Sequence, residues 1–185
     1  RSHKTRVGGI SSSSCDLISG VVQGSVIGPL LFLTFINELI EILEYYEIKI
    51  KMFADDAKLY AQIVSIVDVN KLQSALDALS EWAKKWQLCL SIDKCCILNV
   101  GHIDSNIPVN LTLNNNFLPI VNSCRDLGVI VSSDLLPRLH INNIVLKANK
   151  RANMILRCFI SRDINTLLRA FVVYVRPLLE FNSVF

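Results

Sequence analysis

Two adjacent carboxylates, Asp55 and Asp56, lie between two runs of residues that favour β-strands. The runs are residues 48–53 and 58–63, and the short polar break between them is typical of a β-hairpin with the carboxylates at its tip. A turn can point successive side chains into the same open space, whereas a strand alternates them between two faces. Two carboxylates held in this way offer oxygen ligands to a hard divalent cation. The alternative is an acidic turn that is simply solvated.

A second segment with unusual composition precedes the hairpin. Residues 19–32 read SGVVQGSVIGPLLF, and the glycines permit close approach of the backbone to another group. Gln23 can both donate and accept hydrogen bonds. Pro29 at a first helical position predicts a helix that runs to about Tyr45. A turn in front of a buried helix would show the same pattern, so this segment alone does not identify a function.

Taken in order, these motifs resemble those of the reverse transcriptase of non-LTR (LINE-type) retrotransposons, which has an SGVxQGSxxGPLLF string, a helix and then Phe-Ala-Asp-Asp on a hairpin. The family commonly has Pro where this chain has Val22. The resemblance implies an α+β fold, in which a right-hand polymerase palm is followed by a helical thumb and the fingers are largely missing. Further matching residues extend it over almost the whole chain: Trp82, Trp86, Lys94-Cys95, Leu127-Gly128-Val129 and residues 151–157.

The resemblance implies RNA-directed DNA synthesis from deoxynucleoside triphosphates, with an RNA template, a DNA primer and Mg²⁺ (or Mn²⁺) as cofactor. Such transfer holds the attacking and leaving oxygens between two metal ions about 3.5–4 Å apart. By resemblance, Asp55 is the main catalytic metal ligand and Asp56 supports it, while Lys94 offsets charge near the triphosphate. The other ligand belongs to a strand before the glycine-rich segment. That strand is not in this sequence, so we expect the isolated chain not to extend a primer.

The resemblance also assigns residues that contact nucleic acid and nucleotide. The expected template- and nucleotide-binding residues are Gly20, Gln23, Gly24 and Ser25. Leu127 and Gly128 correspond to the primer grip.

The charge of the chain is unevenly distributed. Residues 1–124 carry 10 basic and 12 acidic side chains, a net charge of −2, whereas residues 125–185 carry 9 and 4, a net charge of +5. Four cations of a predicted helix at residues 139–159 share one face, and no acidic residue between Asp134 and Asp163 compensates them. This pattern indicates contact with the phosphates of nucleic acid, although a solvated basic face is the alternative. The four cations are Lys147, Lys150, Arg151 and Arg157.

The resemblance, together with the elements predicted along the chain, implies two parts. Residues 1–123 form a partial palm with the glycine-rich loop, the Asp-Asp hairpin and a long helix at 69–86 that carries Trp82 and Trp86 in its core stripe. Residues 124–185 form the primer-grip segment and a truncated helical thumb. The remaining predicted elements are a hairpin near the N-terminus, a strand at 94–100, a hairpin around residues 114–116, a strand at 126–131, and a helix at 164–175 capped by Asp163 or Ser161.

Other functions and locations are compatible with parts of the sequence. The six cysteines show no CxxC pair, which indicates reduced thiols and an intracellular protein; the family is expected in nucleus and cytoplasm. Residues 17–37 carry no charge and are long enough to span a membrane, but their small residues suit a loop and we expect no membrane contact. The alternatives are a catalytically dead element remnant that at most binds nucleic acid, and a membrane-anchored helical protein. The oligomeric state stays open.

Overall fold

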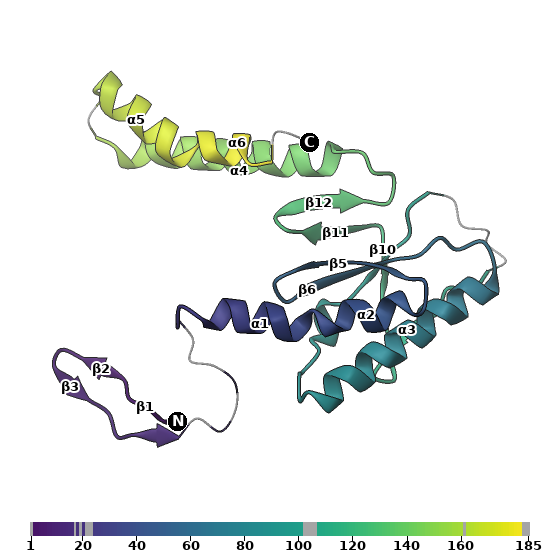
Figure 1. The fold of residues 1–185 in the computed structure, drawn as a ribbon. Helices are drawn as coiled ribbons and strands as arrows, with labels where there is room; N and C mark the ends of the chain where they lie inside the picture. Colours follow the sequence, from purple (N-terminus) through teal and green to yellow (C-terminus); the bar gives the residue numbers. More distant parts are fainter. Residues whose placement is uncertain are drawn as a thin grey trace. The chain divides into compact units, whose positions relative to one another are not determined.

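A computed structural model describes residues 2–16, 18, 20, 24–101, 107–160 and 162–182. The chain divides into two compact units, and we describe each by itself. The first unit comprises residues 1–90 with 111–115, and the second comprises residues 91–110 with 116–185. Both contain helices and strands (Figure 1), which confirms the predicted α+β class.

The helix predicted after Pro29 consists of two segments in the first unit. α1 (Gly28–Ile36) and α2 (Glu38–Glu44) follow each other in nearly the same direction (Figure 1). Asn37 between them keeps φ and ψ of −64° and −27°, and its amide donates to the Leu33 carbonyl oxygen at 3.1 Å. The predicted continuous helix is interrupted just after Asn37, where the Ile40 amide donates to the Asn37 carbonyl oxygen at 3.1 Å in an i→i−3 bond.

The long helix α3 (Ile66–Lys85) begins earlier than the predicted residue 69. The amides of Val64 and Ser65 donate to the Asp68 carboxylate at 3.0 and 2.8 Å, and this arrangement caps the first turn. The two hydrogen bonds hold the pKa of Asp68 below its usual value. The predicted start is too late because apolar periodicity begins only after this polar cap.

The core of the first unit lies where α2 packs against α3 and strand β5 (Lys49–Phe53). Leu39 and Leu43 of α2, four residues apart on one face of the helix, are buried, and Leu43 has no exposed surface. Other buried apolar side chains of this unit are Ile36, Ile48, Val69, Leu76, Leu79, Leu111 and Leu113. These contacts support the hairpin that begins with β5.

The two tryptophans of α3 have different environments. Trp82 is buried, its indole Nε1 donates to Glu38 at 3.1 Å, and its ring lies 5.7 Å from that of Phe35. Trp86 meets Phe35 edge-on with ring centroids 5.0 Å apart, yet 41% of Trp86 is exposed. Lys85 Nζ lies 5.6 Å from the Trp86 ring centroid. The core prediction is confirmed for Trp82 and wrong for Trp86, because the helix ends just before Trp86.

Each sheet that the described residues form has two strands. Near the N-terminus, β1 (Ser2–His3) pairs with β4 (Cys15–Asp16), and β2 (Arg6–Val7) pairs with β3 (Ile10–Ser11). Both pairs are antiparallel and fully exposed, and they confirm the predicted N-terminal hairpin.

The predicted hairpin around residues 114–116 is also present, with shorter strands. β8 (Thr112–Leu113) and β9 (Asn116–Phe117) flank Asn114 and Asn115, whose φ values are 50° and 63°. Both central residues therefore adopt the left-handed conformation that asparagine tolerates.

The strands of the second unit differ most from expectation. β7 (Ile97–Leu98) pairs in parallel with β10 (Ile120–Val121). The predicted strand at 94–100 is wrong at its start, because residues Ile92–Lys94 form a 3₁₀ turn, η1. The Cys95 amide closes this turn by donating to the Ile92 carbonyl oxygen at 2.9 Å.

Three helices complete the second unit. α4 (Arg138–Cys158) lies beside α5 (Ile164–Tyr174) and α6 (Arg176–Glu180), as Figure 1 shows. Asp163 caps α5 by accepting from the Thr166 amide at 2.8 Å, as predicted, while Ser161 lies outside the described residues. The buried core comprises Ala148, Ile155, Ala170 and Val175, with Ala152, Phe159 and Leu167 packed against it.

Among the helices that the structure describes, none is both long and apolar enough to cross a membrane.

Candidate functional site

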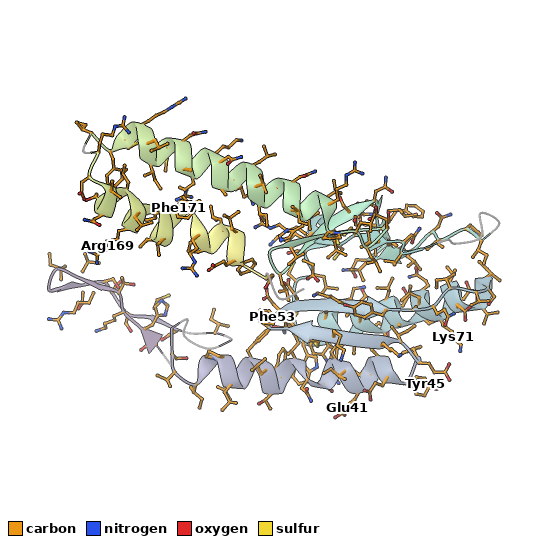
Figure 2. The ribbon with its side chains drawn as sticks, turned by 90° about the horizontal axis from the view of Figure 1, so that it is seen from above. Glu41, Tyr45, Phe53, Lys71, Arg169 and Phe171 are labelled. Carbon is orange, nitrogen blue, oxygen red and sulfur yellow. The ribbon has the colours of Figure 1, made fainter. Side chains whose placement is uncertain are left out.

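The predicted Asp-Asp hairpin is present in the first unit. β5 pairs antiparallel with β6 (Asp56–Tyr60), from Lys49 opposite Tyr60 to Phe53 opposite Asp56. Ala54 and Asp55 form the turn, and Ala54 has a positive φ of 52°. The second strand starts earlier than the predicted residue 58, because Asp56 already belongs to the ladder. Phe53 lies at the end of β5 (Figure 2).

Both carboxylates are open to solvent. Asp55 lies in the turn, Asp56 is the first residue of β6, and both are exposed. In the described part of the chain, no ion pair or hydrogen bond occupies either side chain. Carboxylate oxygens in this state suit Mg²⁺ or Mn²⁺, with water completing the coordination.

The described residues do not bring a third ligand to this turn. They contain no group of three or more His, Cys, Asp or Glu side chains arranged to hold a metal ion. Two open clefts of the first unit lie elsewhere: one borders Tyr45, Tyr46 and Lys71, the other is lined by residues 47–51 and Glu44, and neither includes Asp55 or Asp56. Within the described residues, the turn therefore offers two exposed carboxylates and no third side chain positioned as a metal ligand beside them.

We expect the chain by itself to bind Mg²⁺ weakly, with a Kd of about 1 mM or higher, because two carboxylates leave most of the octahedral shell to water. A titration with Mn²⁺ should broaden the NMR signals of residues 54–57 first, and Asp55→Ala should remove this selectivity. Asp77→Ala, which removes an exposed carboxylate on α3, is the control. Tight stoichiometric binding in calorimetry that Asp55→Ala abolishes would contradict this prediction.

The glycine-rich loop precedes α1 in the same unit. Gly20 and Gly24 are exposed, and Gly24 has a φ of 84°, which a side chain would strain. Ser25 Oγ accepts from the Gly28 amide at 3.1 Å, so this hydroxyl orders the entry into the helix. Gln23, and Val22 with it, lie outside the described residues.

The remaining predicted site residues belong to the second unit. Lys94 is exposed on η1. Leu127 and Gly128 form the turn between β11 (Ser123–Asp126) and β12 (Val129–Ser132), so the predicted continuous strand at 126–131 is wrong. Positive φ values of 44° and 93° at Leu127 and Gly128 reverse the chain there. Leu127 and residues 129–131 are apolar, and such a run favours a strand over a turn.

The basic face predicted on α4 is exposed. All four cations are solvent-accessible, and no ion pair within the described residues involves any of them. The opposite side packs on the core through Ala148 and Ile155. These cations are Lys147, Lys150, Arg151 and Arg157.

Comparisons with known proteins point to one family. A family model for "Reverse transcriptase (RNA-dependent DNA polymerase)" matches residues 6–131. The chain is 32% identical over 142 residues to the RNA-directed DNA polymerase from mobile element jockey of Drosophila funebris, over 74% of this chain and 15% of that protein. The jockey protein of Drosophila melanogaster is 27% identical over 150 residues, covering 78% and 16%.

A third relative comes from another element. The retrovirus-related Pol polyprotein from type-1 retrotransposable element R1 of Bradysia coprophila is 30% identical over 127 residues, covering 68% of this chain and 13% of that protein. No solved structure matches the chain significantly. The chain thus spans 13–16% of the length of the curated relatives that it matches.

Proposed function

Because the chain belongs to the reverse transcriptase (RNA-dependent DNA polymerase) family, we propose that it is the palm and thumb part of an RNA-directed DNA polymerase of a LINE-type element. The observation that carries this proposal is the exposed turn with Asp55 and Asp56, which lies inside the segment that matches the family. The proposed substrates are an RNA template, a DNA primer and deoxynucleoside triphosphates.

The proposed chemistry places the metal-binding role on the hairpin turn. Asp55 would hold a divalent ion directly, and Asp56 would support it from the first position of β6. When bound, the metal stabilises negative charge on the reacting oxygens during transfer of the nucleotide. The ladder between β5 and β6 fixes the turn, so the carboxylates keep their direction while substrates bind.

The proposal assigns further contacts with substrate to other residues. Gly24 and Ser25, with Gly20 and Gln23, would contact the template base and the incoming nucleotide. Lys94 would offset charge on the leaving pyrophosphate. The turn at Leu127 and Gly128 would present backbone groups to the primer strand.

Primer extension tests the proposal most directly. We define the extended polymerase as a polypeptide in which upstream reverse transcriptase residues, including the strand with the first metal-binding aspartate, precede this chain. It should extend a DNA primer on an RNA template when Mg²⁺ is present, whereas the chain alone should not. Binding of template–primer without any extension, under conditions where the Drosophila funebris relative is active, would favour a remnant that only binds nucleic acid.

The exposed face of α4 should bind an RNA–DNA duplex with little sequence preference. Replacing Lys147, Lys150, Arg151 and Arg157 by Ala should weaken binding. It should also flatten the plot of log affinity against log salt by about 0.7–0.9 for each phosphate that the helix no longer neutralises. Fluorescence anisotropy at several salt concentrations measures both quantities.

The matched control for this experiment removes the same charge from the first unit. It replaces the exposed residues Lys4, Lys49, Lys51 and Lys84 by Ala. If both quadruple variants change the salt dependence equally, the duplex responds only to net charge and the α4 face is merely solvated.

A further inference from the structure

The turn between β11 and β12 lies against an aromatic ring from the far end of the second unit. A methyl group built on Gly128 would meet Phe181 Cε1 at 2.8 Å and Cζ at 3.1 Å. Carbon atoms do not approach so closely without displacement, so a side chain at position 128 would have to push the Phe181 ring aside. The same glycine also needs its φ of 93°, which L-residues rarely adopt.

The ring itself is attached to the helices of this unit. Phe181 directly follows α6, and its amide donates to the Pro177 carbonyl oxygen at 3.1 Å. α6 packs against α4 and α5, and Val175 at its start is only 2% exposed. The position of the Phe181 backbone is therefore tied to the core of the three helices.

The backbone conformation of the Leu127–Gly128 turn is itself unfavourable. Leu127 has a φ of 44°, which is unfavourable for a residue with a branched side chain. A strained conformation persists only where its surroundings fix it. Here the antiparallel ladder from Ser123 opposite Ser132 to Asp126 opposite Val129 fixes one side, and the Phe181 ring covers the other.

We propose that Phe181 is a positioning residue for the Leu127–Gly128 turn, through which the helices of the second unit set the geometry of the backbone that contacts the primer strand. This proposal rests on the proposed function of the chain as a polymerase. It requires that removal of the ring loosens the turn and weakens binding of the primer–template, while the nucleotidyl transfer step itself is unchanged.

The first test uses the extended polymerase in steady-state primer extension. Phe181→Ala should raise the KM for primer–template about tenfold, the upper range for one aromatic contact, and leave kcat unchanged. Phe181→Tyr keeps the ring and should restore the original KM. Phe117→Ala, which removes an aromatic residue that is 76% exposed on β9, is the control and should change neither constant. An unchanged KM in Phe181→Ala would overturn the proposal.

The second test needs no polymerase activity and uses the chain alone. The amides of residues 127–129 should exchange hydrogen faster in Phe181→Ala, while those of the α4 core keep their protection. Gly128→Ala should also speed hydrogen exchange at the turn, because its methyl group would clash with the Phe181 ring. In a protein that already carries Phe181→Ala this clash is absent, so Gly128→Ala should increase the exchange rate less there than in the unsubstituted protein. Strictly additive effects would overturn the contact between ring and turn.

The two tests separate the two proposals. One outcome is non-additive hydrogen exchange in the Gly128 and Phe181 variants, with no primer extension by the extended polymerase. This would confirm the contact between ring and turn but contradict the proposed function, and with it the role of Phe181 in primer binding. Coupling with normal primer affinity would show that the ring is only structural.

Discussion

Asp55→Asn in the extended polymerase is expected to lower RNA-templated primer extension by about 10²–10³-fold, because a metal ligand contributes several kcal/mol of charge stabilisation in the transition state. Asparagine keeps the size and one oxygen of the side chain but removes its charge. The effect should appear in the maximal rate constant of single-turnover extension, measured with saturating primer–template and Mg²⁺. Asp56→Asn should lower the rate less, because the role proposed for Asp56 is to support Asp55.

The control for this experiment is Asp77→Asn, an exposed carboxylate on α3 that accepts a hydrogen bond from Gln73 at 2.9 Å. It should leave the rate of extension unchanged. If extension survives Asp55→Asn, then Asp55 is not the metal ligand, and the assignment of this hairpin as a polymerase site fails.

Leu43→Ala should lower the free energy of unfolding of the first unit by about 3 kcal/mol, within the range for buried Leu→Ala substitutions. Leu43 has no exposed surface and lies where α2 meets α3 and β5. The substitution would leave a cavity, because α2, α3 and β5 surround the position and restrict the collapse of neighbouring side chains into it. Urea denaturation followed by tryptophan fluorescence measures the change through Trp82, which is buried in the same unit.

A second leucine provides the comparison. Leu33 on α1 is 52% exposed, and Leu33→Ala should cost less than about 1 kcal/mol. Equal destabilisation by the two substitutions would mean that the packing of α2 on α3 and β5 does not determine the stability of the first unit.

Sequence reasoning succeeded where the signal was local. The Asp-Asp hairpin, the N-terminal hairpin and the Asn114–Asn115 turn all follow from β-prone runs around residues that tolerate a turn. Apolar spacing predicts helices α4 and α5 nearly to their ends, and residue type identifies Asp163 as a cap. These features depend on neighbours in the sequence.

The sequence-based predictions that were wrong concern residues where one local pattern outweighs another, or where the structure depends on residues distant in the sequence. Leu127 interrupts the predicted strand although leucine gives no turn signal, because the chain reverses at Leu127 and Gly128, both with positive φ. Trp86 falls on the apolar stripe, yet the helix ends before it and leaves it at the surface. The contact between Gly128 and Phe181 joins residues far apart in the chain, so periodicity and residue type give no indication of it.

The register of the β5–β6 hairpin also has a consequence for the order of folding. Its ladder begins at Phe53 opposite Asp56, so only a minimal loop must close before the first cross-strand contacts form. Hairpins of this kind form in about 1–10 μs, whereas β7 and β10 pair Ile97 with Ile120 in parallel and require a much longer loop to close first. The two carboxylates therefore reach their relative positions early, through contacts of low sequence separation. Their spacing is encoded in the dozen residues 49–60, and forming it requires no long loop to close.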